Sequence, residues 1–207
     1  NFLSDNQFGF QKGKSTTDCI FLFHSIIAKT LNSKKKLYCV FIDFEKCFYK
    51  INRNYLWHKL LNYQLSTKFV SAIKTMYSTV KQCVQYNSNM SDFFSSHVGL
   101  KQGDPSSSLM FIMFVNDILS CTNTDLDSIF TVDELKIFLL LFADDAVLFA
   151  HSSKSLQLML NDLDQYCRTW GLTVNINKTK VMVFERGRGT SCNISIHNWK
   201  SLRLSSI

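Results

Sequence analysis

Two adjacent carboxylates, Asp144 and Asp145, stand inside the most apolar stretch of the chain, LKIFLLLFADDAVLFA at residues 135–150. An ionised carboxylate in apolar surroundings costs several kcal/mol unless a partner compensates for it. The chain therefore has to bring this pair to water or to a cation, and a tight turn between two strands does so. For this segment taken alone, the alternative is a type I′ turn that uses Asp only for its backbone preferences.

A third acid, Asp43, follows another apolar stretch, LYCVFIDF at residues 37–44. This composition is typical of a strand that is covered on both faces. A carboxylate at such a strand end can converge with those of a neighbouring hairpin, and Mg²⁺ prefers oxygen ligands. Two such ions about 3.5–4 Å apart activate an attacking hydroxyl and stabilise the leaving oxygen in phosphoryl transfer. The alternative is an Asp that caps the next helix.

Two further segments carry groups suited to phosphates. GLKQGDPS at residues 99–106 places two glycines around Lys101-Gln102, before a proline that opens a helix, and helix N-termini bind anions. WGLTVNINKTK at residues 170–180 carries Lys178 and Lys180, which are suited to a triphosphate. The alternatives are an ordinary turn for the first segment and a surface lysine pair for the second.

Composition narrows the class of protein. Lysine and arginine exceed aspartate and glutamate by 23 − 16 = 7, and a basic surface attracts polyanions such as nucleic acid. The 7 cysteines stand without a CxxC pair, which argues against a disulfide framework or zinc site and for a reducing compartment. The N-terminus does not read as a signal peptide, and the apolar run at 137–143 is too short to span a bilayer. We therefore expect an intracellular protein, nuclear or cytoplasmic, that is neither secreted nor membrane-bound.

The periodicity of the chain predicts an α+β arrangement, an antiparallel sheet with helices on one face. The single proline and the lack of a Gly/Ser linker indicate one domain. Helices are predicted at 16–31, 52–62, 66–79, 105–119 and 154–169. Strands are predicted at 37–44, in a hairpin at 80–98 that turns at 87–89, and twice within 135–150. Residues 172–175 and 180–184 are predicted to form a second hairpin or a β-α join. Loops are predicted at 32–36, 120–134 and 186–189.

In this order and at these spacings, the segments closely resemble the reverse transcriptase domain of non-LTR (LINE-like) retrotransposons. QFGFQKGKSTT at 7–17 resembles the segment that precedes the palm in that family. The polymerase motifs A, B, C and D are matched, in that order, by residues 43–48, 99–108, 142–145 and 171–179. The resemblance covers roughly residues 6–185 and implies a fragment of one such domain, a polymerase palm with part of the fingers and no thumb. The palm would comprise 37–49 and 99–185, the fingers and their connection 1–36 and 50–98, and a truncated C-terminal edge 186–207.

The same resemblance implies the catalytic residues. Asp43 and Asp144 would hold two Mg²⁺ ions, or Mn²⁺ in their place, with Asp145 assisting and the backbone carbonyl of Phe44 as a further ligand. Lys178 would donate a proton to the departing pyrophosphate. The reaction would join a dNTP to the 3′-OH of a DNA primer on an RNA template.

Substrate contacts are implied as well. Phe48 would abut the sugar and reject a 2′-hydroxyl. Gln102, with Gly103, would contact the incoming nucleotide or the template beside it. The template strand would lie near Lys12, Lys14 and Ser15. Nothing in the sequence fixes an oligomeric state.

The chain departs from the family pattern in several places. Motif A ends Cys47-Phe48-Tyr49 where the family has Ala-Phe-Asp, and Ser106-Ser107-Ser108 replaces Leu-Ser-Pro in motif B. No primer-grip motif is present at Trp199–Leu204. A catalytically inactive nucleic-acid-binding remnant of a decayed element is therefore the alternative to a working RNA-directed DNA polymerase. Another palm-type nucleotidyltransferase, such as an RNA polymerase, is a third hypothesis, which the bulk of Phe48 disfavours.

Overall fold

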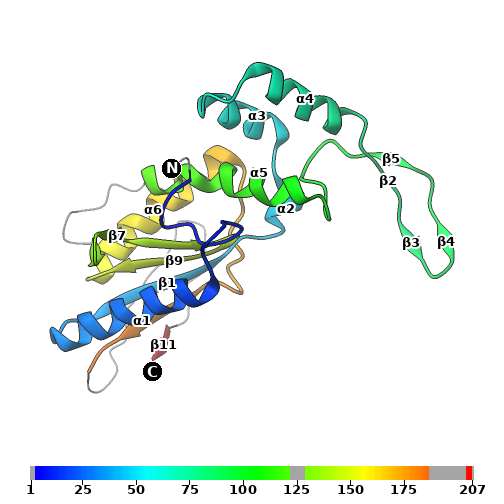
Figure 1. The fold of residues 1–207 in the computed structure, drawn as a ribbon. Helices are drawn as coiled ribbons and strands as arrows, with labels where there is room; N and C mark the ends of the chain where they lie inside the picture. The colour runs from blue at the N-terminus through cyan, green and yellow to red at the C-terminus, as the bar shows by residue number, and fades with distance from the viewer. Residues whose placement is uncertain (1–2, 122–128, 187–203, 207) are drawn as a thin grey trace.

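A five-stranded sheet forms the centre of the protein, with strand order β11-β10-β1-β9-β8 (Figure 1). The computed structural model describes residues 3–121, 129–186 and 204–206. The strands are β1 (Leu37–Asp43), β8 (Leu139–Phe142), β9 (Asp145–Ala150), β10 (Lys180–Phe184) and β11 (Leu204–Ser206). Neighbouring strands are antiparallel, except that β10 and β11 are parallel. The predicted α+β class is confirmed, whereas the predicted loop at 187–189 and residues 199–203 lie outside the described residues.

The helices begin and end close to the predicted positions, because their caps are written in the sequence. They are α1 (Thr16–Asn32), α2 (Cys47–Lys50), α3 (Arg53–Asn62), α4 (Thr67–Ser78), α5 (Pro105–Val115) and α6 (Ser153–Trp170), with a 3₁₀ turn η1 (Asn116–Ser120) after α5. Ser15 and Asp18 form a reciprocal capping box at the start of α1. Gly171, with φ +69°, takes the left-handed conformation that ends α6.

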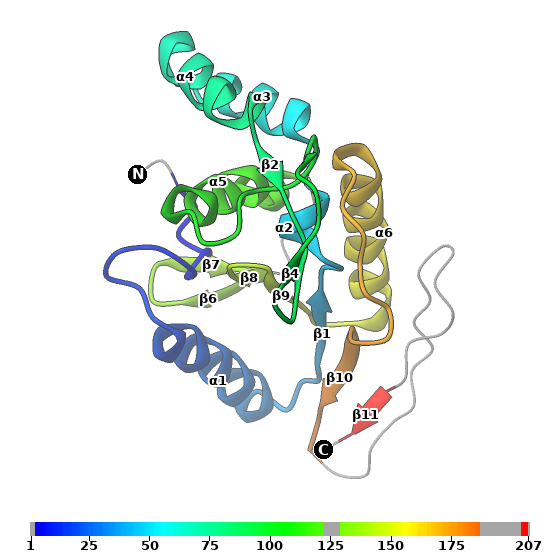
Figure 2. The same cartoon turned by 90° about the vertical axis from the view of Figure 1, so that its right-hand side faces the viewer.

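Helices cover both faces of the sheet (Figure 2). Side chains alternate along β1, so that Leu37 and Cys39 pack in one cluster with Ile26 of α1. Val40 and Ile42 point to the opposite face and pack in the cluster that contains α5 and α6. The prediction placed helices on one face; α1 also covers the other, because β1 is apolar on both sides.

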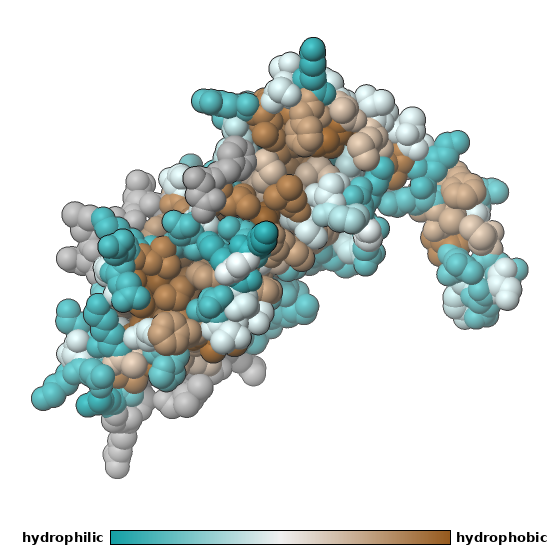
Figure 3. Space-filling view, viewed as in Figure 1, coloured by the Kyte–Doolittle hydropathy of each residue, from teal (hydrophilic) through white to brown (hydrophobic). Residues whose placement is uncertain are grey.

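Residues between α4 and α5 form a ribbon that projects from the rest of the molecule (Figure 1). Its two short ladders pair β2 (Lys81–Gln82) with β5 (Phe94–Ser95), and β3 (Gln85–Tyr86) with β4 (Asn89–Met90). The hairpin predicted at 80–98 is therefore confirmed. Figure 3 shows hydrophobic residues on α4 and the ribbon. The exposed ones include Phe69 and Met76 of α4, and Tyr86, Met90 and Phe93 of the ribbon.

Arg53 joins the base of this ribbon to α3. Its buried guanidinium donates to the backbone carbonyls of Ser96, Val98 and Gly99, at 2.6, 3.1 and 2.8 Å, and to that of Tyr77. The guanidinium therefore ties the chain that leaves the ribbon to the helix beneath it. It also fixes where the glycine-rich segment at 99–106 begins.

Three predicted details are wrong. Residues 130–132 form β6 (Phe130–Val132), paired with β7 (Leu135–Ile137), within the predicted loop 120–134. The segment 135–150 consequently holds three strands in place of two. Of the two alternatives for 172–175 and 180–184, the second hairpin is absent, because β10 lies beside β1 and Val174 bridges to Phe44. The partner of β10 is distant in the sequence, whereas β6 and β7 pair locally across Asp133-Glu134, at the end of a segment whose polar composition does not indicate strands.

Among the helices of residues 3–121 and 129–186, none combines the length and the apolar character needed to cross a membrane.

Candidate active site

The acidic pair stands at the tight turn between β8 and β9. Phe142 pairs with Asp145, so that Ala143 and Asp144 form the tip. Ala143 has φ +57°, a left-handed conformation that is uncommon outside glycine. The predicted turn between two apolar strands is therefore present, and it holds Asp144 at the end of the sheet.

Asp43 ends β1 directly opposite Asp145 of β9. Directly opposed residues of an antiparallel pair point to the same face, with Cβ atoms about 5 Å apart. Three carboxylates from two distant parts of the sequence therefore lie at one end of the sheet, although Asp145 is exposed and does not line the cavity that Asp43 and Asp144 share.

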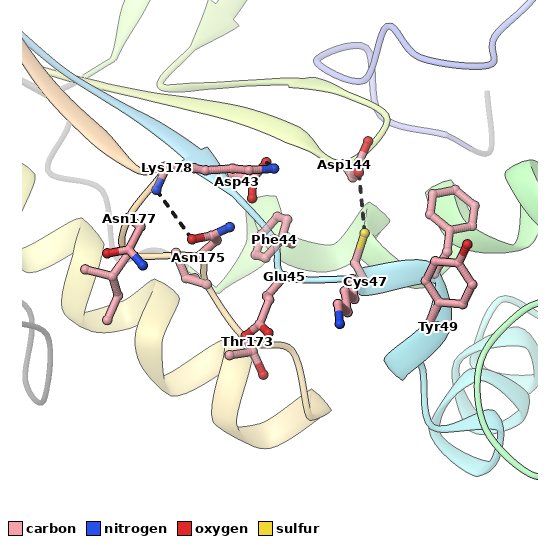
Figure 4. Close-up of a pocket in the computed structure, with 14 residues that line it drawn as sticks. Asp43, Phe44, Glu45, Cys47, Tyr49, Asp144, Thr173, Asn175, Asn177 and Lys178 are labelled. Carbon is pink, nitrogen blue, oxygen red and sulfur yellow. Dashed lines mark hydrogen bonds and ion pairs between the residues drawn. The ribbon is translucent and has the colours of Figure 1, made fainter.

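Asp43 and Asp144 also line one cavity of about 980 Å³ (Figure 4). The predicted residues Phe44, Phe48 and Lys178 line it as well. Its remaining walls are formed by Glu45, Lys46, Cys47, Tyr49, Thr173, Val174, Asn175, Ile176 and Asn177. The cavity thus brings together predicted motifs A, C and D.

Negative charge at this end of the sheet exceeds positive charge. Burial raises the pKa of Asp145 above its usual value, and the nearby carboxylates of Asp144 and Asp43 raise it further. Lys178 acts in the opposite direction, and its Nζ lies 3.5 Å from Asp43 Oδ1. The side chain of Lys178 is 69% exposed, so this ion pair is weakened by water.

The donor set fits a divalent cation in its chemistry, since hard cations take carboxylate oxygens. As the side chains stand, however, no three His, Cys, Asp or Glu residues within the described parts of the chain form a group arranged to hold a metal ion. In Figure 4, Asp43 lies beside Lys178 and Asp144 points toward Cys47.

The backbone beside Asp43 is held by the predicted motif D segment. Glu45 N–H donates to the Thr173 carbonyl at 2.7 Å, and Asn175 N–H donates to the Asp43 carbonyl at 2.7 Å. These two bonds flank the bridge between Phe44 and Val174, so the carbonyl of Phe44 points away from the motif D segment. Phe44 therefore retains an oxygen for another partner.

A second cavity of about 420 Å³ adjoins the first, because Phe48 and Tyr49 line both. Gln102 and Gly103 also line this second cavity, as expected for motif B. Phe48 stacks on Phe111 with ring centroids 4.4 Å apart. The Tyr49 hydroxyl donates to Gln102 Oε1 at 2.6 Å, so the residue that replaces the family's Asp holds the motif B glutamine.

Cys47, the other departure in motif A, lies against the acidic turn. Its Sγ is 3.6 Å from Asp144 Oδ2. Burial, followed by the proximity of Asp144, raises the pKa of Cys47 to about 12. The thiol therefore remains protonated near neutral pH and donates a weak hydrogen bond to the carboxylate.

Neither of the two cavities is lined by the residues predicted to lie near the template, Lys12, Lys14 and Ser15. Lys12 is exposed. The ammonium of Lys14 donates to the carbonyls of Asp5 and Gln7, at 2.7 and 3.0 Å. Ser15 caps α1. Lys14 and Ser15 thus shape the segment that precedes the palm.

Residues 1–201 match the family described as "Reverse transcriptase (RNA-dependent DNA polymerase)". The chain belongs to the reverse transcriptase family. This reverse transcriptase domain is 27% identical over 187 residues to the "Probable RNA-directed DNA polymerase from transposon BS" of Drosophila melanogaster, covering 86% of the chain and 20% of the relative. It is 23% identical over 168 residues to the "Transposon TX1 uncharacterized 149 kDa protein" of Xenopus laevis, covering 81% and 13%. The chain therefore spans a fifth or less of these relatives, and the predicted resemblance to retrotransposon reverse transcriptases is confirmed.

Solved telomerase structures share the fold of this reverse transcriptase domain. Apo telomerase from Candida tropicalis superposes with a TM-score of 0.64 at 14% identity, over 93% of the chain and 35% of telomerase. Candida albicans telomerase, in complex with a fragment of telomeric RNA, gives a TM-score of 0.64 at 15% identity, over 85% and 32%. Identities this low establish the fold alone, and they confirm the predicted α+β palm.

Proposed function

We propose that this chain is the polymerase domain of a retrotransposable element, an RNA-directed DNA polymerase that transfers nucleotides from dNTPs to a primer 3′-OH. One observation carries the proposal: Asp43 and Asp144, far apart in the sequence, line a single cavity, and Asp145 pairs opposite Asp43. Residues 37–49 and 99–185 act as the palm, and residues 1–36 and 50–98 as the fingers and their connection. The protein works in the nucleus or the cytoplasm, where its template and primer are found.

Asp43, Asp144, Asp145 and the carbonyl of Phe44 are the groups that would hold two Mg²⁺ ions, or Mn²⁺ in their place. Bound there, such ions would lower the pKa of the attacking hydroxyl and stabilise the leaving oxygen. Lys178 serves two roles. It offsets the charge of Asp43 in the free protein, and it supplies a proton to the departing pyrophosphate.

Substrates are held by the two adjoining cavities. The ring of Phe48, fixed by its stack on Phe111, excludes a 2′-hydroxyl. Gln102 and Gly103 contact the nucleotide or the template beside it. The RNA template and DNA primer are held mainly through their phosphates, as the net charge of +7 favours, with Lys12 as an exposed phosphate contact. Lys14 and Ser15 support this contact by shaping the backbone near the template.

Primer extension on an RNA template, with purified protein that contains residues 1–207, tests this function. Mg²⁺ and Mn²⁺ are each supplied to the wild type, Asp43→Ala, Asp144→Asn and the control Asp133→Asn. Asp133 is exposed in the β6–β7 turn at φ +51°, a conformation that asparagine tolerates. We expect extension by the wild type and Asp133→Asn and none by the two site variants, with all four proteins folded.

Two outcomes would contradict this assignment. Binding of an RNA–DNA duplex without extension by the wild type, with either metal, would favour the inactive remnant. Extension by Asp43→Ala would remove Asp43 from the metal site.

A further inference from the structure

The side chain of Gln7 is fully buried behind the acidic turn, at 0% exposure. Its Oε1 accepts hydrogen bonds from the backbone N–H of Gly9 at 2.8 Å and from that of Ala143 at 3.0 Å. A single amide oxygen therefore joins the N-terminal segment to the turn that carries Asp144 and Asp145.

The backbone around Gln7 supports this contact. Phe8 N–H donates to the Leu141 carbonyl at 2.7 Å, and Leu141 N–H donates to the Asn6 carbonyl at 2.9 Å. These bonds form a parallel bridge along β8, the edge strand of the sheet. The segment is thus fixed in register beside the strand that leads into the acidic turn.

Gly9 allows the two backbones to touch. A Cβ atom at this position would lie 2.2 Å from the Ala143 nitrogen and 2.8 Å from its Cα. Side chains larger than hydrogen are therefore excluded while the turn keeps its place. The backbone of Gly9 therefore packs directly against the backbone of Ala143 in the turn.

Ala143 needs such support. A left-handed non-glycine residue persists only where its surroundings hold it. Gln7 Nε2 is buried without a hydrogen-bond partner among the described residues, which is unfavourable for folding. Of the two polar atoms of the Gln7 amide, it is the oxygen that has hydrogen-bond partners. One of these partners is Ala143, the strained residue next to Asp144.

We propose that Gln7 is a positioning residue of the metal site. By fixing the Ala143 amide, its side-chain oxygen sets the turn and so the direction in which the Asp144 carboxylate enters the cavity. Gln7 contacts neither metal nor substrate and acts through Ala143. This inference rests on the proposed function, because it assigns a purpose to the orientation of Asp144.

The test compares Gln7→Met with Gln7→Glu. Methionine keeps the length of the side chain but offers no oxygen to the two N–H groups, whereas glutamate keeps the oxygens. Ile26→Ala is the control for lost stability, because Ile26 of α1 is buried in the same cluster as Phe8 and lines neither cavity. Each protein is assayed for Mn²⁺ binding by electron paramagnetic resonance without nucleotide or nucleic acid, for hydrogen exchange of the Ala143 amide, and for thermal midpoint.

We expect Gln7→Met to weaken Mn²⁺ binding about 10- to 100-fold, the range typical for groups that orient a metal ligand. Exchange at the Ala143 amide should accelerate by at least about tenfold. Gln7→Glu should restore most of both properties. Ile26→Ala should lower the thermal midpoint and leave Mn²⁺ affinity unchanged.

The inference would be overturned if Gln7→Met bound Mn²⁺ with the affinity of the wild type and exchanged the Ala143 amide at the wild-type rate. Equal weakening by Ile26→Ala would also overturn it, since it would make the role of Gln7 merely structural. If the wild type itself fails to bind Mn²⁺ while Gln7→Met accelerates Ala143 exchange, the proposed metal site fails and the hold of Gln7 on the turn stands. Should Gln7→Met not fold, Gln7→Asn, which withdraws the oxygen by one methylene, carries the same prediction.

Discussion

Replacing Lys59 by methionine should destabilise the fold without touching the active site. The Lys59 side chain is 2% exposed between α3, α5 and α6. Its Nζ donates to Asp117 Oδ1 at 2.6 Å, to the Phe114 carbonyl at 2.7 Å and to the Tyr166 hydroxyl at 2.7 Å. It also lies 3.9 Å from the ring centroid of Trp170. The ammonium of Lys59 therefore joins α3 to three other helical segments, α5, η1 and α6.

The expected loss in the free energy of unfolding depends on which contacts Asp117 keeps after Lys59 is replaced. Removing one partner of a buried ion pair costs about 3–5 kcal/mol, because the other charge is left uncompensated. The Asp117 side chain is 34% exposed and keeps the hydrogen bond from the Tyr166 hydroxyl, so water and tyrosine replace part of what lysine supplied. We therefore expect about 3 kcal/mol, the lower end of this range. For a chain of this length, that loss lowers the thermal midpoint by about 6–12 °C.

Urea unfolding at pH 7 measures this loss directly. Lys74→Met, in exposed α4, is the matched control and should change the free energy of unfolding by less than about 0.5 kcal/mol. The double variant Lys59→Met/Asp117→Leu should recover most of the loss, because a buried pair is often replaced by apolar residues at little cost. A loss below about 1 kcal/mol for Lys59→Met would refute the reasoning, because it would be the value of a surface ion pair.

Three further predictions concern the lining of the two cavities. Phe48→Ala should raise incorporation of rNTPs relative to dNTPs by up to about 100-fold in primer-extension competition, and unchanged sugar discrimination would count against the steric role. Tyr49→Phe removes the donor to Gln102 and should raise the KM for dNTP about two- to tenfold, with kcat little changed; steady-state kinetics in which only kcat falls would contradict this. The raised pKa of Cys47, about 12, keeps its buried thiol protonated, so iodoacetamide at pH 8 should label Cys83 before Cys47 in peptide mass mapping, and equal labelling would refute the burial argument.

The parts of the fold that the sequence predicts are those with local causes. Ser15 and Gly171 mark helix ends by their own hydrogen bonding and backbone freedom, so α1 and α6 are predicted closely. The apolar runs of β1 and β9 are equally local. The positions of the acids at the ends of these strands are predicted for the same reason. An ionised carboxylate beside an apolar strand has to reach water or a cation.

The parts that the sequence misses depend on distant partners. β10 pairs with β1, far back in the sequence, and not with the residues that precede it at 172–175. The four-residue helix α2 is too short for periodicity to reveal. The bond from the Ala143 amide to Gln7 spans 136 residues, and a glutamine in a glycine-rich segment gives no local sign of it. Recognition of the family motif points to that segment but not to its contact.

The strand β1, which carries Asp43, pairs with strands that are synthesised much later in the chain. Residue 38 pairs with residue 150, and residue 37 with residue 184, so both partners of β1 are made more than a hundred residues later. Contacts this distant close slowly, and unpaired apolar strands promote aggregation until they do. On the ribosome, the hydrogen-bonding edges of β1 stay unpaired until β9 and then β10 have emerged, so we expect chaperone demand to peak over that interval of translation.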